Sequence, residues 1–174
     1  MNPLYTDDTL VAHDAFNPNL AGVWANPEKP DLGTWQFIEA EGSAYRLIIR
    51  EKGQSLIVDP EVDGIFEAHL LRLGDHLILD VYPEEPPSVN EFYKAHVIPM
   101  HSFMKVTLEG HVLSLADFDS EWLQDGIDTG RIDIRHERRD EMIVLTAPTR
   151  DLQALILRHV DEAFEQPDVI YRLQ

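Results

Sequence analysis

The stretch Leu20-Ala21-Gly22-Val23-Trp24 opens a series of short segments with strand character that continues almost to the last predicted helix. Each segment either alternates apolar and polar residues or is apolar over the length of a strand, and Gly, Asp or Pro separates it from the next. The sequence therefore predicts about nine consecutive strands, near residues 22–26, 33–40, 43–50, 64–73, 76–82, 95–108, 111–118, 131–138 and 141–146.

Most connections between these predicted strands are short. They include Glu41-Gly42, Gly74-Asp75, Glu109-Gly110 and Asp140-Glu141. Connections of hairpin length join antiparallel neighbours, whereas parallel strands need long crossovers. We therefore expect an up-and-down meander.

One face of most predicted strands is apolar. In 64–73, for example, Phe66 and Leu70 share a face opposite Glu67. An open sheet of this size would expose edge strands and one apolar face, and closure removes both problems. We expect a mainly all-β protein, an antiparallel β-barrel of about eight to ten strands in a single domain at 20–174, after an N-terminal arm at 1–19.

Two helices accompany the predicted barrel. Asp119 can cap a short helix near 119–126, which Gly126 would end. Thr149 can cap a C-terminal helix near 150–164, and apolar residues recur at helical spacing in it: Leu152, Leu155, Ile156, Val160, Ala163 and Phe164. After this helix, Val169 and Tyr171 belong to an alternating segment that is either a terminal strand or an extended tail.

The triplet Gly22-Val23-Trp24, preceded by Leu20, resembles the Gly-x-Trp signature of the first strand of lipocalins, which belong to the calycin group of barrels. The resemblance implies a barrel whose closed end is plugged by Trp24, with Gly22 beside it. In that family an arginine from the late part of the chain packs on the tryptophan. Arg135, Arg138 and Arg172 are the candidates here, and no spacing rule chooses among them.

A longer part of the chain, roughly residues 20–165, is similar to a group of uncharacterised bacterial lipocalin-like proteins. The resembling stretches are Gly64-Ile65-Phe66-Glu67-Ala68, Leu77-Ile78-Leu79-Asp80, His96-Val97-Ile98-Pro99-Met100-His101-Ser102-Phe103 and Asp119-Ser120-Glu121-Trp122-Leu123. This resemblance implies a fold and no particular activity.

Composition excludes several classes of protein. The chain has 32 Asp and Glu against 14 Lys and Arg, a formal net charge of −18 that repels nucleic acid and anionic membranes. It has no cysteine, so disulfides and thiolate sites are impossible. No apolar run approaches the roughly 20 residues that span a bilayer. The first residues lack a leader pattern, so we expect a cytoplasmic location, or a periplasmic one if a signal peptide has been removed.

Two histidines, His96 and His101, are the strongest polar candidates. On an unbroken strand they would face opposite sides, but a bend near Pro99 could bring them to the same side. On the same side, the two histidines could bind a metal or move protons. The alternatives are that they line the barrel or its rim, or that they are only structural residues of the wall. A metal site needs a third ligand that the sequence does not identify, so we predict no metal site.

The sequence predicts no catalytic residues. A Gly-rich phosphate loop, a Gly-x-Ser-x-Gly elbow and a His-Glu-x-x-His motif are all absent. No cofactor is identified either.

Aromatic residues on the predicted strands either line a pocket for an apolar molecule or fill the core. The candidate lining residues are Trp35, Phe37, Tyr45, Phe66, Tyr93, His96, His101 and Phe103. Our leading hypothesis is a protein that binds a small apolar or amphipathic ligand, such as a fatty acid or a tetrapyrrole, in the barrel. The alternatives are an enzyme that uses a histidine or carboxylate in the same cavity, and an interaction protein with a filled barrel, for which a homodimer is one form.

Overall fold

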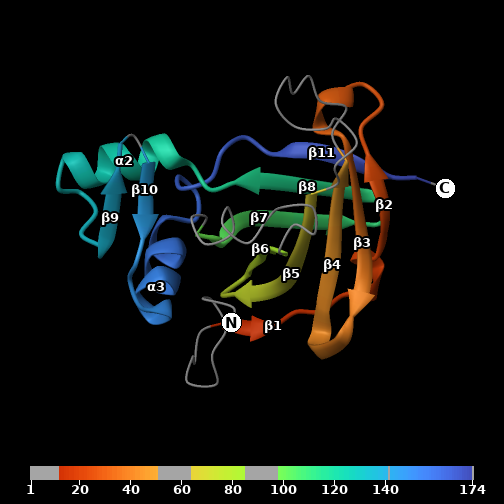
Figure 1. The fold of residues 1–174 in the computed structure, drawn as a ribbon, viewed down its shortest axis with the longest axis horizontal. Helices are drawn as coiled ribbons and strands as arrows, with labels where there is room; N and C mark the ends of the chain where they lie inside the picture. The colour runs from red at the N-terminus through yellow and green to blue at the C-terminus, as the bar shows by residue number, and fades with distance from the viewer. Residues whose placement is uncertain (1–11, 51–63, 85–97, 141, 174) are drawn as a thin grey trace.

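The protein folds into a closed antiparallel barrel of eight strands (Figure 1). The computed structural model describes residues 12–50, 64–84, 98–140 and 142–173. Around the ring the order is β5-β4-β3-β2-β11-β8-β7-β6, and pairing of β6 with β5 closes it. The strands are β2 (Gly22–Ala25), β3 (Thr34–Ala40), β4 (Ala44–Arg50), β5 (Gly64–Leu73), β6 (His76–Pro83), β7 (Ser102–Glu109), β8 (Val112–Asp117) and β11 (Asp168–Arg172). The prediction of a mainly-β barrel with short helices is confirmed.

Tight turns join several of the neighbouring strands in the meander from β2 to β8. Gly74 and Gly110 lie between β5 and β6 and between β7 and β8, each with φ of +61°. Glycine adopts this left-handed conformation without the steric cost that a Cβ would add. Each strand in this part of the chain therefore pairs with the next one.

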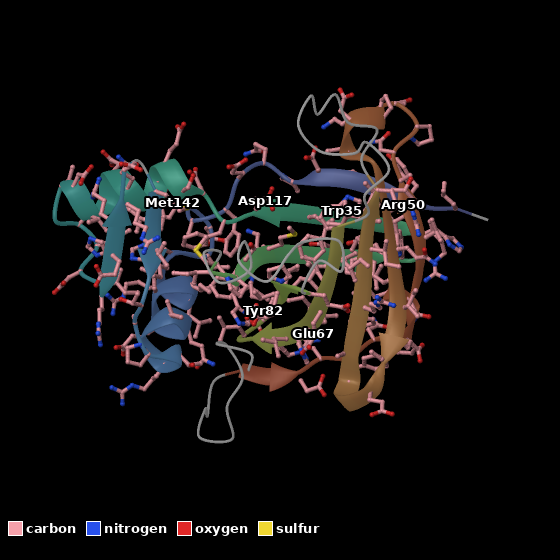
Figure 2. The ribbon with its side chains drawn as sticks, viewed as in Figure 1. Trp35, Arg50, Glu67, Tyr82, Asp117 and Met142 are labelled. Carbon is pink, nitrogen blue, oxygen red and sulfur yellow. The ribbon has the colours of Figure 1, made fainter. Side chains whose placement is uncertain are left out.

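Two of the predicted strands lie outside the barrel. The predicted strands at 131–138 and 141–146 do not join the barrel, because β9 (His136–Arg139) and β10 (Met142–Leu145) form a separate two-stranded sheet. Figure 2 shows Met142 on this sheet, beside the helices. Three of the four β9 residues are exposed and charged, so this strand brings no apolar face to a barrel interior. The C-terminal segment β11 pairs with both β2 and β8 and closes the ring.

The barrel interior is a packed apolar core. Its buried side chains come from every strand of the ring and from Leu20, the last residue of a short 3-10 helix, η1 (Pro18–Leu20). They are Leu20, Trp24, Phe37, Tyr45, Leu47, Ala68, Leu70, Leu79, Val81, Val106, Leu113, Leu115 and Ile170. Ahead of this helix, β1 (Ala12–Asp14) pairs with β5.

Helix α2 (Ser120–Asp128) follows β8 and lies beside β9 and β10 (Figure 1), where Leu123 packs with Ile132 and Leu155. It begins as predicted, because the Asp119 carboxylate accepts a hydrogen bond from the Trp122 amide at 2.9 Å. It does not end at Gly126, which was expected to terminate it. Gly126 is buried within the helix, and a Cβ there would lie 2.4 Å from the Ile132 side chain. Gly126 therefore allows the helix to pack closely against Ile132, and it does not end the helix.

Helix α3 (Thr149–His159) packs on the outer face of the barrel wall. Pro148 occupies the cap position, so Thr149 is the first helical residue and not the cap that the sequence predicted. The helix also ends earlier than expected, at His159. Its apolar stripe contributes to an outer cluster of buried residues: Leu71, Leu73, Ile78, Ala116, Leu152, Ile156, Val160, Ala163 and Phe164.

Candidate functional site

One end of the barrel is closed around Trp24. This side chain is fully buried, and its Nε1 donates a hydrogen bond to the Leu20 carbonyl at 2.9 Å. The Arg172 guanidinium lies 5.0 Å from the centre of the Trp24 ring. It also donates to the carbonyls of Ala21, at 2.8 Å, and of Asn19. Of the three arginines that the sequence left open, Arg172 is the one that packs on Trp24.

Gly22 makes this close packing possible. Its φ is +144°, and a Cβ added there would lie 3.3 Å from Arg172 Cζ. Both the backbone conformation and the available space therefore favour glycine at this position.

The N-terminal arm is anchored to the same core through Tyr45. The Tyr45 hydroxyl donates to the Asn17 carbonyl at 2.9 Å and accepts from the Asn17 amide at 2.8 Å. Phe16 stacks on the Tyr45 ring at 4.9 Å, and Phe37 meets the same ring edge-on. Burial raises the pKa of Tyr45, so this group remains a neutral phenol that donates to the arm.

Near the connection 26–33, several interior apolar side chains are only partly buried. Trp35, Ile49 and Phe66 lie on the neighbouring strands β3, β4 and β5, and each is only half-buried. Trp35 pairs directly with Trp24 across β2 and β3. Leu32 and Met104 are half-buried beside the same core. Trp35 Nε1 donates to the Leu32 carbonyl at 2.9 Å, which holds the indole in place. We call these five residues the open-end cluster.

Polar groups stand near the open-end cluster. Asp117 pairs with Met104 in the sheet, and Figure 2 shows it at the end of β8 nearest to α2. Burial raises the pKa of Asp117, and the neighbouring Asp168 carboxylate adds to the effect. Asp168 itself accepts a hydrogen bond from Lys29 Nζ at 2.8 Å. This end of the barrel therefore combines an apolar surface with a charged rim.

The interior side chains below the open-end cluster are shielded from solvent. Tyr45, Leu47 and Leu79 are completely buried. Three cavities lined by described residues lie outside the interior: between α3 and residues 131–135, on the outer face of β7 and β8, and near Arg172 at the closed end.

The predicted lining residues fall into separate groups. Trp35 and Phe66 belong to the open-end cluster, whereas Phe37 and Tyr45 are part of the buried interior. Phe103 packs against the outer cluster and not in the interior. Tyr93 and His96 lie outside the described residues.

His101 lies on the outer face of the barrel, where it meets a buried carboxylate. Its Nδ1 is 2.8 Å from Asp80 Oδ1, and the Tyr82 ring lies 4.5 Å from the imidazole. Asp80 stands on β6 between the interior residues Leu79 and Val81, so it points outward, yet it is only 1% exposed. Its second oxygen, Oδ2, is buried and has no hydrogen-bond partner among the described groups.

The Asp80–His101 pair resembles arrangements that handle protons. Burial raises the pKa of Asp80, and the hydrogen bond with His101 works against this rise. A carboxylate on Nδ1 holds the ring in one orientation and leaves Nε2 to exchange a proton. Sequence reasoning singled out His101 but missed Asp80. The available signal was a single acidic residue inside the otherwise apolar run Leu77-Ile78-Leu79-Asp80-Val81.

Comparisons of the chain with family models, with curated proteins and with solved structures find no match. In the described part of the chain, no group of three or more His, Cys, Asp or Glu side chains is placed to hold a metal ion. None of the helices described there has the length and apolar character needed to cross a membrane.

Proposed function

We propose that this protein is a lipocalin-like binding protein that takes up a small apolar or amphipathic ligand at the open end of its barrel. The observation that supports this proposal is the unequal burial of the interior. Trp35, Phe66 and Met104 are half-buried beside the core, whereas Trp24, which pairs with Trp35 across β2 and β3, is completely buried. The charged rim suits a ligand that carries one polar group.

The energy available from this surface is moderate. Burial of apolar surface contributes about 25 cal/mol per Å², so about 400 Å² shared between ligand and protein contributes roughly 10 kcal/mol. The lost freedom of the ligand costs at least about 4 kcal/mol. The remaining 6 kcal/mol or so corresponds to a Kd of tens of micromolar.

Native mass spectrometry of the protein as purified tests whether it carries a ligand. We expect an additional mass that disappears after organic extraction. A second assay titrates the extracted protein with N-phenyl-1-naphthylamine, a neutral fluorescent probe of apolar sites. Phe66→Ala should raise the Kd of the probe about tenfold, since a buried aromatic side chain contributes roughly 1.5–3 kcal/mol.

Ile38→Ala is the matched control, because Ile38 lies on the same strand as Trp35 but is 41% exposed and outside the interior core. This variant should bind the probe as the wild type does. A clean mass together with the same Kd for both variants would refute ligand binding at the open end.

A second candidate function is acid–base chemistry at the Asp80–His101 pair, which the buried Asp80 carboxylate favours. Hydrolysis of p-nitrophenyl acetate provides a simple assay of an activated imidazole. His101→Gln should lower the rate at least tenfold, whereas His111→Gln, at an exposed histidine, should leave it unchanged. Equal rates for the two variants would exclude this function.

A further inference from the structure

A separate cavity of about 270 Å³ lies between one face of α3 and the irregular segment 131–135 that leads into β9. The helix residues that line it follow a spacing of three and four, so they share a face. The lining consists of Arg131, Ile132, Asp133, Ile134, Arg135, Asp151, Ala154, Leu155, Arg158 and His159. We call it the helix cavity. It does not include any residue of the open-end cluster or of the Asp80–His101 pair.

The helix cavity combines an apolar floor with basic side chains. Ile132 and Leu155 are buried, and Ile134 is half-buried in the same apolar cluster. Three arginines and one histidine line the cavity, against two aspartates. This local excess of positive charge runs against the composition of the whole chain, which has 32 acidic and 14 basic residues.

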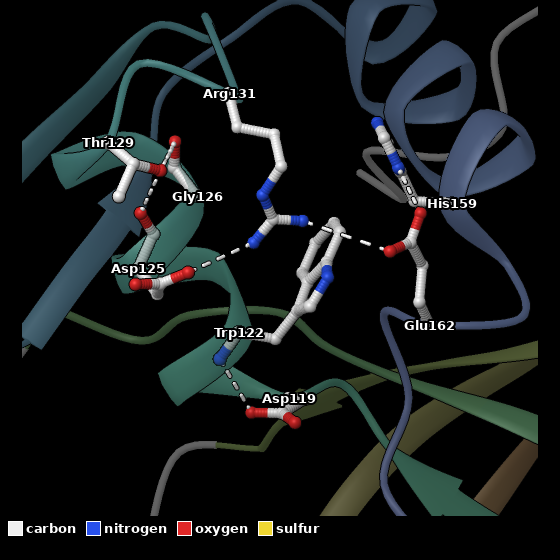
Figure 3. Close-up of polar contacts among 8 residues, drawn as sticks. All are labelled: Asp119, Trp122, Asp125, Gly126, Thr129, Arg131, His159 and Glu162. Carbon is white, nitrogen blue, oxygen red and sulfur yellow. Dashed lines mark hydrogen bonds and ion pairs between the residues drawn. The ribbon is translucent and has the colours of Figure 1, made fainter.

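One of the three arginines is already engaged. Figure 3 shows Arg131 between two carboxylates and over the Trp122 ring, with its nitrogens 3.3 Å from Asp125 and 3.8 Å from Glu162. His159 is also engaged, because its Nδ1 lies 3.0 Å from the Glu162 carboxylate. These contacts fix one wall of the cavity.

Arg135 and Arg158 differ from Arg131. Within the described part of the chain, neither guanidinium has an ion pair or a side-chain hydrogen bond. The position of Arg158 in the last turn of α3 can be explained by the helix dipole, which favours positive charge there. The dipole does not explain Arg135, which comes from a separate segment and lines the same cavity.

We propose that the helix cavity binds a small organic anion, whose carboxylate or phosphate pairs with Arg135 or Arg158 and whose apolar part lies over Ile134 and Leu155. Guanidinium groups match the planar, bidentate geometry of carboxylate and phosphate. The volume is just below the roughly 300 Å³ at which small-molecule sites begin, so it suits a molecule of the size of phenyl phosphate or benzoate.

The test is a titration of the ¹⁵N-labelled protein, followed by NMR chemical shifts, with phenyl phosphate, benzoate, inorganic phosphate and benzyl alcohol. Phenyl phosphate, benzoate or both should shift the amides of residues 131–135 and 151–159 in a saturable way. Inorganic phosphate and benzyl alcohol, which each supply only half of the proposed contacts, should bind at least tenfold more weakly than the better of these two anions.

Four variants locate the site. Arg135→Gln and Arg158→Gln each remove one available charge, and at least one of them should raise the Kd about tenfold. Ala154→Phe fills the cavity from an exposed position of α3 without changing any charge, and it should abolish binding. Arg139→Gln removes an equal charge from the neighbouring exposed strand β9, outside the cavity, and should change the Kd less than twofold.

Phenyl phosphate and benzoate, used alone, distinguish a phosphate ligand from a carboxylate ligand, and saturable binding of either one supports the proposal. The proposal is wrong if neither anion causes saturable shifts, or if Arg139→Gln weakens binding as much as the cavity variants do. Equal binding of inorganic phosphate would also overturn it, because an adventitious ion would then account for the shifts. Phe66→Ala should leave this binding unchanged, which keeps the helix cavity distinct from the open end of the barrel.

Discussion

Replacing Arg172 with alanine tests how the closed end of the barrel is held together. The guanidinium lies 5.0 Å from the Trp24 ring centre and donates to the carbonyls of Ala21 and Asn19. Arg172→Ala removes all three contacts at once. It also removes a link between the C-terminal strand β11 and the residues that precede β2.

The size of the effect follows from these contacts. A partly desolvated cation–π contact contributes about 1–2 kcal/mol. A hydrogen bond from a charged donor contributes about 1.5–3 kcal/mol when well shielded. The three contacts share one half-exposed group and are not additive, so we expect a total loss of about 3 kcal/mol. For a chain of this length, 3 kcal/mol lowers the Tm by roughly 6–12 °C.

Urea unfolding followed by circular dichroism measures this free energy directly. Arg172→Lys should lose about half as much as Arg172→Ala, roughly 1.5 kcal/mol, because it keeps a charge near the ring but lacks the planar donor fork. Arg150→Ala is the control, since the Arg150 side chain is 86% exposed, and its effect should stay below about 0.5 kcal/mol. A loss below 1 kcal/mol for Arg172→Ala, or an equal loss for the control, would refute this account of the closed end.

Three further substitutions test other parts of the structure. Tyr45→Phe removes both hydrogen bonds to Asn17 and should lower the free energy of urea unfolding by about 2 kcal/mol; an unchanged value would contradict the anchoring of the arm. Gly126→Ala places a Cβ 2.4 Å from the Ile132 side chain and should cost about 1–3 kcal/mol, seen as a lower Tm in calorimetry; a Tm at or above that of the wild type would show that the helix has more room than described. Burial raises the pKa of Asp80, so the carboxyl group of Asp80 holds its proton more tightly in the folded state than in the unfolded state. The stabilisation that results is complete below about pH 3.9, and it is lost as the pH rises through the raised pKa. Asp80→Asn should therefore flatten the decline of the unfolding free energy above pH 4, and parallel curves for variant and wild type would exclude this role of burial.

Strand positions were predictable because they depend on local patterns. Alternation of apolar residues and tight turns such as Gly74 placed most strands from β2 to β8 close to their observed bounds. The exception is the strand predicted at 95–108, because β7 begins only at Ser102 and the described residues 98–101 before it are not strand. The strand character of β9 and β10 was also recognisable, but their partners were not. Pairing depends on which sheet edge lies within reach after the chain has folded back, and that is decided by contacts far apart in the sequence.

The candidate sites were only partly predictable for the same reason. Trp24 was identified from a local motif, whereas the choice of Arg172 depends on hydrogen bonds that connect residues more than 150 positions apart. His101 was noticed as a polar residue of a strand-like segment. Its partner Asp80 lies 21 residues away on β6, whereas His101 precedes β7, and no local pattern links the two.

The sequence by itself determined an acidic, mainly-β chain whose alternating segments and short turns favour a closed antiparallel barrel. The tertiary structure alone decided that β11 closes the ring and that Arg172 packs on Trp24. It also decided that Arg135 and Arg158 line one cavity. The physical reason is that periodicity and turn chemistry act between neighbouring residues, whereas ring closure, ion pairing and cavity lining join segments that only the completed fold brings together.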